Sequence, residues 1–246
     1  MVPSTREITM PNIAVVTGAS SGVGRATAIT LATAGWEVTL LARRAEALQK
    51  TINLAPPDAR PRMHLAPCDI TDNTAVQAIA KSVLAKHSRI DALVNAAGTN
   101  IPDRSLEKMT EARYREVFDV NLTGALNTIQ AFLPAMRQQQ GGTIVNINSI
   151  AGQNASVLSG ASYVMSKFAL AGLTQSINAE EAQHNIRACS IFPGDINSEL
   201  LEKRPTPPPM DVRSKMLQPQ DLADCILLVL NLPPRAVVEE LRIVPR

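Results

Sequence analysis

Short apolar runs alternate along the chain with longer stretches in which apolar residues recur every three or four positions. The runs predict β-strands, and the helical spacing between them predicts α-helices. The strands are expected at residues 13–16, 36–42, 62–66, 92–95, 143–148, 187–192 and 240–244, and the helices at 26–34, 45–53, 75–86, 110–136, 160–183 and 220–230. Strands that alternate with helices in this way are typical of an α/β protein, with a doubly wound parallel sheet covered by helices on both faces.

One expected helix carries a polar residue on its apolar face. Between residues 110 and 136 the apolar positions form one continuous stripe, which predicts a single long helix, and Asn121 lies on that stripe. A buried asparagine must satisfy its amide donors and its acceptor. Asn121 is therefore either a structural hydrogen-bond hub or a site residue that holds a water molecule, and the sequence by itself favours the hub.

Composition narrows the class of protein. With 246 residues, of which 45% are apolar, the chain can bury one large core, so we expect a single domain over residues 1–246. A net charge of +2, dispersed Lys and Arg and 3% aromatic residues argue against nucleic-acid binding. Residues 1–11 are polar and the late apolar run 225–230 is too short to span a membrane, so we expect a cytoplasmic protein that does not bind membranes.

Cysteines and histidines form no recognisable metal or disulfide pattern. The chain has three unclustered cysteines, Cys68, Cys189 and Cys225. Their odd number and spacing fit a reducing compartment. His64 and Cys68 are four residues apart and could share a metal ion, but His87 and His184 are remote in sequence and nothing completes a ligand set. We therefore predict no metal site.

A glycine-rich turn follows the first predicted strand. Gly18, Gly22 and Gly24 lie between that strand and the helix expected from residue 26. Glycine permits a tight turn, the close approach of a pyrophosphate and close packing of helix on strand, while the N–H groups at a helix start bind phosphate. The spacing Gly-x-x-x-Gly-x-Gly differs from the Gly-x-Gly-x-x-Gly of many dinucleotide folds. The turn predicts a Rossmann-like dinucleotide site, and an ordinary loop is the alternative.

Two arginines end the second predicted strand. An acidic residue at this position of a dinucleotide fold accepts hydrogen bonds from the adenosine ribose, but here Arg43 and Arg44 follow the strand. A guanidinium can bind a 2′-phosphate that a carboxylate would repel. The pair predicts NADP as the cofactor, and a solvated pair at a helix start is the alternative.

Further candidates lie at the ends of the next two strands. Asp69 follows the third strand, where it could accept from an adenine amine or cap the helix that begins near Thr74. Asn95 ends the fourth strand, and the small residues Ala96 and Gly98 would let the backbone lie beside a ring or a ribose.

The centre of the chain carries the residues suited to acid–base chemistry. Ser149 follows the fifth strand, at the sheet edge where α/β proteins bind ligands. Tyr163 and Lys167 are four residues apart and therefore share a helix face. Because a nearby cation favours the phenolate, we predict that Tyr163 titrates below its ordinary value of about 10. The spacing by itself is also common in surface contacts.

A proline-rich segment follows the sixth strand. Residues 195–214 contain four prolines and cannot form a long helix. The segment is either a mobile lid over the substrate or a passive linker.

Together these motifs resemble the short-chain dehydrogenase/reductase family from residue 13 to about residue 244. The resemblance rests on Thr17-Gly18-Ala19-Ser20-Ser21-Gly22-Val23-Gly24, Asn95-Ala96-Ala97-Gly98, Ser149, Tyr163-Val164-Met165-Ser166-Lys167 and Pro193-Gly194. It implies that Tyr163 exchanges the hydroxyl proton, that Lys167 lowers its pKa and holds the nicotinamide ribose, and that Ser149 binds the substrate carbonyl. Asn121 would anchor a water in a proton relay.

The resemblance also implies an NADP-binding surface and a small-molecule carbonyl or alcohol substrate. The cofactor would contact Gly18, Ser20, Ser21, Gly22, Val23, Gly24, Arg43, Arg44, Asp69, Ile70, Asn95, Ala96, Gly98, Tyr163, Lys167, Pro193, Gly194, Ile196 and Ser198. Many family members are oligomers, so a homodimer or homotetramer built on the helices at 110–136 and 163–183 is expected by analogy.

The chain departs from the family pattern at two points. The interval from Ser149 to Tyr163 is one residue longer than usual, and Ser198 stands where threonine is common. The C-terminal part resembles the branch with NADP-dependent 3-hydroxy acid dehydrogenases and carbonyl reductases. The leading interpretation is an NADP-dependent carbonyl reductase or alcohol dehydrogenase. The alternatives are a catalytically silent NADP-binding regulator and a methyltransferase, against which Arg43 argues.

Overall fold

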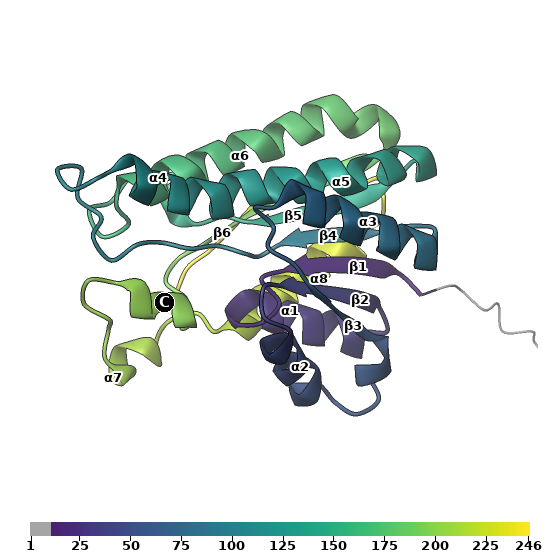
Figure 1. Ribbon diagram of the computed structural model, residues 1–246, viewed down its shortest axis with the longest axis horizontal. Coiled ribbons are helices and arrows are strands. Elements are labelled where there is room, and N and C mark those ends of the chain that lie inside the picture. Colours follow the sequence, from purple (N-terminus) through teal and green to yellow (C-terminus); the bar gives the residue numbers. More distant parts are fainter. Residues whose placement is uncertain (1–10) are drawn as a thin grey trace, which may run out of the picture.

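Seven parallel strands form one sheet at the centre of the protein. The computed structural model describes residues 11–246. Residues 1–10, which belong to the polar segment 1–11 considered above, lie outside this range. The sheet has the order β3-β2-β1-β4-β5-β6-β7, and all its pairs are parallel (Figure 1). The strands are β1 (Ile13–Thr17), β2 (Glu37–Ala42), β3 (Met63–Pro67), β4 (Ala92–Asn95), β5 (Gly142–Ile147), β6 (Ile186–Pro193) and β7 (Glu240–Ile243). The predicted doubly wound α/β fold, Rossmann-like and with helices on both faces, is confirmed.

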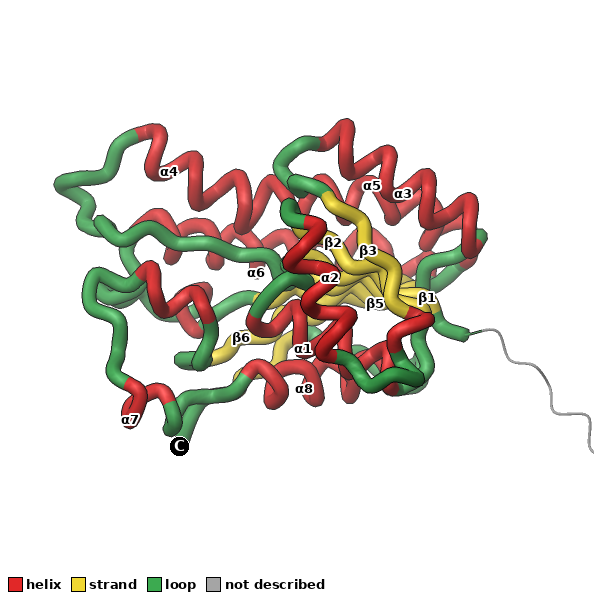
Figure 2. Tube along the Cα trace, turned by 60° about the horizontal axis from the view of Figure 1, so that its bottom comes forward, coloured by secondary structure: helices red, strands yellow, loops and turns green. Residues whose placement is uncertain are grey.

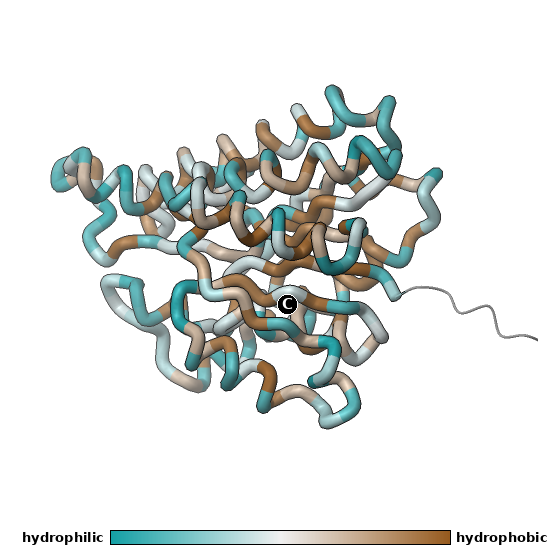
Figure 3. The backbone as a smooth tube through the Cα atoms, turned by 45° about the vertical axis from the view of Figure 1, so that its right-hand side comes forward, coloured by the Kyte–Doolittle hydropathy of each residue, from teal (hydrophilic) through white to brown (hydrophobic). Residues whose placement is uncertain are grey.

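Helices cover both faces of this sheet (Figure 2). The helices are α1 (Gly22–Thr33), α2 (Ala45–Leu54), α3 (Asn73–His87), α4 (Glu111–Phe118), α5 (Gly124–Gln139), α6 (Ala161–Glu181), α7 (Met210–Arg213) and α8 (Pro219–Asn231). Successive residues of a strand face opposite sides, so β1 contributes Ala14 and Val16 to the core under α1, α2 and α8, and Ile13 and Val15 to the core under α3, α5 and α6. Both faces are buried at the centre of the sheet, so β1 and β4 consist mostly of apolar residues, whereas the edge strands β3 and β7 are only partly buried. Figure 3 shows the hydropathy of each residue along the backbone.

The sheet order reverses between β1 and β4. From β1 the chain adds β2 and then β3 on one side, and it then returns to the other side of β1 and adds β4 to β7 in order. Loops that leave the carboxyl ends of β1 and β4 therefore diverge to opposite faces and open a crevice. The glycine turn after β1 and the segment from Ala96 to Gly98 after β4 border this crevice.

The helix predicted over residues 110–136 differs from an ideal one in its middle. It begins with α4 and ends with α5, but a π-helical segment from Asp119 to Thr123 joins them. Apolar periodicity cannot reveal such a segment, because one wide turn shifts the face without changing the spacing on either side. Gly124 follows the π segment, and a Cβ there would lie 2.5 Å from Cδ1 of Ile70. The absence of a side chain lets this helix approach the end of β3.

The proline-rich segment contains two short ordered elements. A 3-10 helix, η5 (Glu199–Lys203), and the four-residue α7 replace the long helix that the prolines exclude. An isolated bridge between Ile196 and Leu217 ties the beginning of the segment to its end. Across residues 11–246, no helix has both the length and the apolar character required to cross a membrane.

Candidate active site

A cleft of about 920 Å³ lies at the carboxyl ends of the strands. Most of the sequence-predicted site residues line it: Gly18, Ser20, Ser21, Gly22, Val23, Arg43, Arg44, Asp69, Ile70, Ala96, Gly98, Ser149, Tyr163, Lys167, Pro193, Gly194, Ile196 and Ser198. Three predicted residues, Gly24, Asn95 and Asn121, do not line the cleft. They lie beneath its surface, where they hold its walls in place.

The glycine turn forms one end of the cleft. Gly18 has φ +66°, and a Cβ there would lie 2.8 Å from the Ala97 backbone, so a side chain would push the β1 and β4 loops apart. A Cβ on Gly24 would lie 2.4 Å from the Gly18 carbonyl oxygen, which shows that Gly24 serves the packing of α1 on β1. Ser21 precedes α1, makes no side-chain cap and is followed by no acidic residue in the first turn. The start of α1 therefore presents backbone N–H groups to the cleft and suits a phosphate.

A carboxylate faces this helix start from the opposite wall. A Cβ built on Gly22 would lie 3.4 Å from the Ser198 side chain and 3.6 Å from Oε2 of Glu199. Oε1 of Glu199 accepts a 3.3 Å contact from the Arg25 guanidinium of α1. Glu199 thus places negative charge beside the region in which α1 would bind a phosphate.

Arg43 and Arg44 follow β2 and are exposed along the cleft. Within residues 11–246 neither guanidinium makes an ion pair, so both are free to meet an anion. Asp69 lies close by: hydrogen bonds from the Thr71 backbone, and to a smaller extent the Thr71 hydroxyl and the charge of Arg43, lower its pKa. The donor set at the end of β2 fits a phosphate and lacks the carboxylate that would repel one.

The proposal that Asp69 caps the next helix is wrong. Asp72 is the N-cap residue of α3, and its Oδ1 accepts a 3.1 Å hydrogen bond from the Ala75 N–H. Oδ1 of Asp69 instead accepts from the N–H and hydroxyl of Thr71, at 3.0 and 2.8 Å. The carboxylate of Asp69 shapes the loop at the cleft edge, and its second oxygen remains available there.

Asn121 is buried and connects three segments. Its Oδ1 accepts a 2.7 Å hydrogen bond from the Thr99 N–H, and its Nδ2 donates to the Thr99 carbonyl oxygen and to the Ser166 hydroxyl, each at 3.0 Å. The π-helical segment turns this side chain inward from the long helix. Asn121 therefore fixes the β4 loop to α6 as a hydrogen-bond hub, next to Lys167, whose Nζ is 4.0 Å from a Cβ built on Gly98.

Like Asn121, Asn95 lies beneath the surface of the cleft. Its Nδ2 donates to Oδ1 of Asn146 at 2.9 Å, and its Oδ1 accepts from the Thr128 hydroxyl at 2.7 Å. Both the nitrogen and the oxygen of the side-chain amide bond to protein atoms, so Asn95 joins β4 to β5 and to α5. A sequence-based assignment to the cleft could not distinguish this residue from its exposed neighbours.

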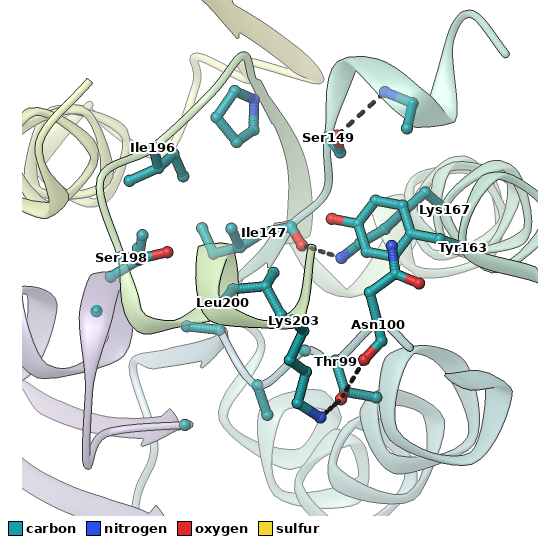
Figure 4. Close-up of a pocket in the computed structure, with 18 of the residues that line it drawn as sticks. Thr99, Asn100, Ile147, Ser149, Tyr163, Lys167, Ile196, Ser198, Leu200 and Lys203 are labelled. Atoms are coloured by element: carbon teal, nitrogen blue, oxygen red, sulfur yellow. Dashed lines mark hydrogen bonds between the residues drawn. The ribbon is translucent and has the colours of Figure 1, made fainter. Parts of the chain in front are cut away.

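Ser149, Tyr163 and Lys167 meet at the centre of the cleft (Figure 4). Ser149 extends from the end of β5, and its hydroxyl accepts a 3.1 Å hydrogen bond from the Ala151 N–H, which fixes its rotamer. Tyr163 and Lys167 project from the first turns of α6. Nζ of Lys167 donates a 2.7 Å hydrogen bond to the Ile147 carbonyl oxygen and lies 5.6 Å from the centre of the Tyr163 ring.

Burial dominates the titration of this group, which overturns one prediction. We expected Lys167 to lower the pKa of Tyr163, but the pKa of Tyr163 is raised, because burial of the phenol outweighs the opposing effects of Ser149 and of two arginines, Arg104 and Arg204. The same burial lowers the pKa of Lys167 from 10.5 to about 7. Tyr163 therefore stays a protonated phenol at neutral pH, and the pKa of Lys167 is brought close to neutral pH.

Sequence analysis missed the residues that shape the other end of the cleft. Arg104 donates to the carbonyl oxygens of Ile101, Leu158 and Lys203, at 2.6, 2.6 and 2.7 Å. It therefore joins the β4 loop, the loop before α6 and η5. Nζ of Lys203 donates to the Thr99 hydroxyl at 2.6 Å and closes η5 over the cleft (Figure 4). No local pattern marks these residues, because all their partners except Ile101 are 54 to 104 residues away.

The fold and the cleft define a class: a Rossmann-like protein in which a glycine turn and a hydroxyl, a phenol and an amine line one cleft at the carboxyl ends of the strands. A family model described as short chain dehydrogenase matches residues 12–208. The chain belongs to the short-chain dehydrogenase/reductase family, which is a family of oxidoreductases.

Similar proteins span nearly the whole chain. A farnesol dehydrogenase of Aedes aegypti is 34% identical over 237 residues, which cover 95% of each chain. A metagenomic short-chain oxidoreductase solved in complex with NADP is 33% identical with a TM-score of 0.79, over 94% of this chain and 96% of that one. An alcohol dehydrogenase of Thermococcus sibiricus, solved with 5-hydroxy-NADP, is 27% identical with a TM-score of 0.84, over 96% and 97%.

Proposed function

We propose that the protein is an NADP(H)-dependent oxidoreductase that interconverts a ketone or aldehyde and the corresponding alcohol. The convergence of Ser149, Tyr163 and Lys167 in one cleft carries this proposal, because two hydroxyl groups and an amine there can bind a carbonyl oxygen and supply its proton. The family membership supports oxidoreductase chemistry, and two similar structures contain NADP or a derivative of it.

The proposed cofactor fits the chain's own donors. The start of α1 would hold the pyrophosphate and the end of β2, with Arg43 and Arg44, the 2′-phosphate. Asp69 and Ile70 would lie along the adenine, Ala96 and Gly98 along the ribose, and Pro193, Gly194, Ile196 and Ser198 along the nicotinamide side. Bound NADPH supplies the hydride that adds to the carbonyl carbon.

In the reductive direction Ser149 and Tyr163 would have different roles at the carbonyl oxygen. Ser149, whose rotamer is fixed by the Ala151 N–H, would donate a hydrogen bond to that oxygen and orient it. Negative charge would grow on the oxygen, and Tyr163 would transfer its proton there. In this direction Tyr163 would begin the reaction as a protonated phenol. In its protonated form Lys167 keeps two donors besides the one used by Ile147, and these would hold the nicotinamide ribose.

Asn121 would contribute by position. Its hydrogen bonds to Thr99 and Ser166 hold the β4 loop against α6, and a relay water would lie beside it on the side of Lys167. Residues 195–214 would act as the substrate lid, since η5 closes over the cleft through Lys203. A cytoplasmic location and a homo-oligomeric state stay predictions.

The decisive experiment is a substrate panel. The purified protein is mixed with NADPH and, in turn, with aliphatic and aromatic ketones and aldehydes, and the loss of NADPH absorbance is followed. We expect NADPH consumption with at least one carbonyl compound and the matching alcohol among the products. NADPH binding without consumption across the panel would instead identify a silent NADP-binding regulator.

A further inference from the structure

A cluster of three side chains with metal-binding atoms lies outside the cleft. Glu37 begins β2, His64 is the second residue of β3 and His87 ends α3. A carboxylate oxygen and one nitrogen from each imidazole all lie within 4.8 Å of one another, and the three residues are half-buried. Sequence spacing had excluded a partner for His64, because His87 is 23 residues further along the chain; the fold brings the two together.

The fold explains why these residues meet. Thr39 of β2 pairs with His64 of β3, and Glu37 is two residues before Thr39, so its side chain lies on the same face of the sheet. That face is the one covered by α3, whose Val76, Ala80 and Val83 pack on the core there. The last turn of α3 therefore delivers His87 beside His64, with their ring centres 6.0 Å apart.

We propose that Glu37, His64 and His87 form a binding site for a divalent transition-metal ion such as Zn²⁺. Two imidazoles and a carboxylate are a ligand set that suits Zn²⁺, and a water molecule would complete a tetrahedral site. Zinc bonds of about 2.0–2.1 Å place tetrahedral ligands about 3.4 Å apart. Ligand atoms now within 4.8 Å need to converge by about 1.4 Å at most, which half-exposed side chains can do by rotamer adjustment.

The polar contacts of His64 favour the binding of a metal ion at its Nε2. Its Nε2 lies 2.6 Å from Oε2 of Glu37 and 3.1 Å from Nζ of Lys86. One ring nitrogen offers either a proton to the carboxylate or a lone pair to the ammonium, so it cannot satisfy both neighbours. A metal ion bound by that lone pair and by the Glu37 oxygen would resolve the conflict, and it would displace the Lys86 ammonium from its place.

The site is separate from the proposed active site. Glu37 is at the amino end of β2, whereas the cleft lies at the carboxyl ends, about 16 Å further along the strand at 3.3 Å per residue (Figure 1). The metal would join the edge of the sheet to the end of α3. Its effect is therefore on stability, and the proposal does not depend on the proposed reaction.

Titration calorimetry of chelator-treated protein with ZnCl₂ tests the proposal, with thermal unfolding as a second readout. We expect one equivalent of Zn²⁺ to bind and to raise the unfolding temperature. His64→Ala and His87→Ala should each weaken Zn²⁺ binding at least about tenfold, because removal of a residue that merely hydrogen-bonds to a metal ligand already weakens metal binding by about that factor. Lys86→Met should strengthen it, because the competing ammonium is gone.

His184→Ala is the matched control. His184 is the only other histidine of the chain, and its Nδ1 contacts Gln140 at the end of α5. This variant should bind Zn²⁺ as the wild type does, and an unchanged far-UV circular dichroism spectrum would show that each variant is folded. Absence of Zn²⁺ binding by the wild type, or binding that survives both His64→Ala and His87→Ala, would overturn the proposal.

Discussion

Nζ of Lys167 lies 5.6 Å from the centre of the Tyr163 ring and directs a hydrogen bond to the Ile147 carbonyl oxygen at 2.7 Å. Lys167 is 3% exposed, and its amine meets no carboxylate in the described part of the chain. A neutral acceptor compensates a buried charge only in part, so the pKa of Lys167 falls to about 7.

This relationship predicts a pH-dependent difference in stability between the wild type and Lys167→Met. Below pH 7 the folded and unfolded chains both carry the Lys167 proton, and the burial penalty is fully present. Between about 7 and 10.5 the unfolded chain binds a proton that the folded chain has released, so the wild type gains stability as pH rises. Urea unfolding should show the wild type gaining about 2 kcal/mol relative to the variant over two pH units above 7.

The exposed Lys215 provides the control for this measurement. Lys215→Met should leave the difference from the wild type flat across the same pH range. A flat difference for Lys167→Met as well would show that the buried amine keeps its ordinary pKa.

Tyr163→Phe removes only the hydroxyl proposed to protonate the substrate oxygen. Turnover should fall by about 10²–10⁴, while the dissociation constant of NADPH, measured by its fluorescence, stays close to that of the wild type. The other tyrosine of the chain, Tyr114, packs on Phe118 with ring centres 4.3 Å apart, away from the cleft lining. Tyr114→Phe should keep full turnover, and equal turnover in both variants would assign the proton to another group.

Arg43→Asp should shift the cofactor preference from NADPH towards NADH. The substitution replaces an unpaired guanidinium at the end of β2 with a carboxylate that repels a 2′-phosphate and accepts from ribose hydroxyls. The ratio of kcat/KM for NADPH to that for NADH should fall at least about tenfold, or about 1.4 kcal/mol. Arg235→Asp, an exposed site outside the cleft lining, should leave the ratio unchanged; an unchanged ratio in Arg43→Asp would transfer phosphate recognition elsewhere.

Glu199→Gln should tighten NADPH binding. The Glu199 carboxylate faces the start of α1, 3.6 Å from a Cβ built on Gly22, and would repel a phosphate bound there. Removal of its charge should lower the dissociation constant of NADPH several-fold, and added salt should reduce this gain through screening. Glu202, on the same η5, pairs with Arg213 and does not line the cleft, so Glu202→Gln should have little effect. Weaker binding in Glu199→Gln would mean that its contact with Arg25 supports the site.

Much of the fold follows from local sequence signals. The central strands are short, mostly apolar runs because both sheet faces are buried there, and Gly18, Gly22 and Gly24 mark the turn because a positive φ or a close backbone contact disfavours a side chain at each position. The same local chemistry placed Ser149, Tyr163 and Lys167 in the cleft, since the carboxyl ends of parallel strands meet at one edge, and the family resemblance supplied several further cofactor-binding candidates that line it.

Other features depended on contacts between distant segments. No periodicity in the sequence predicts three of these features: the π-helical turn at Asn121, the hydrogen bonds from Arg104 to distant segments, and the contact between His64 and His87. The pKa of Tyr163 illustrates the reason. Spacing along α6 brings an ammonium close, but the depth of burial decides which charge state is favoured, and burial is a property of the whole packed chain. The sequence by itself determined the sheet, the glycine turn and the set of reactive groups, whereas tertiary packing decided their protonation, their support and their neighbours.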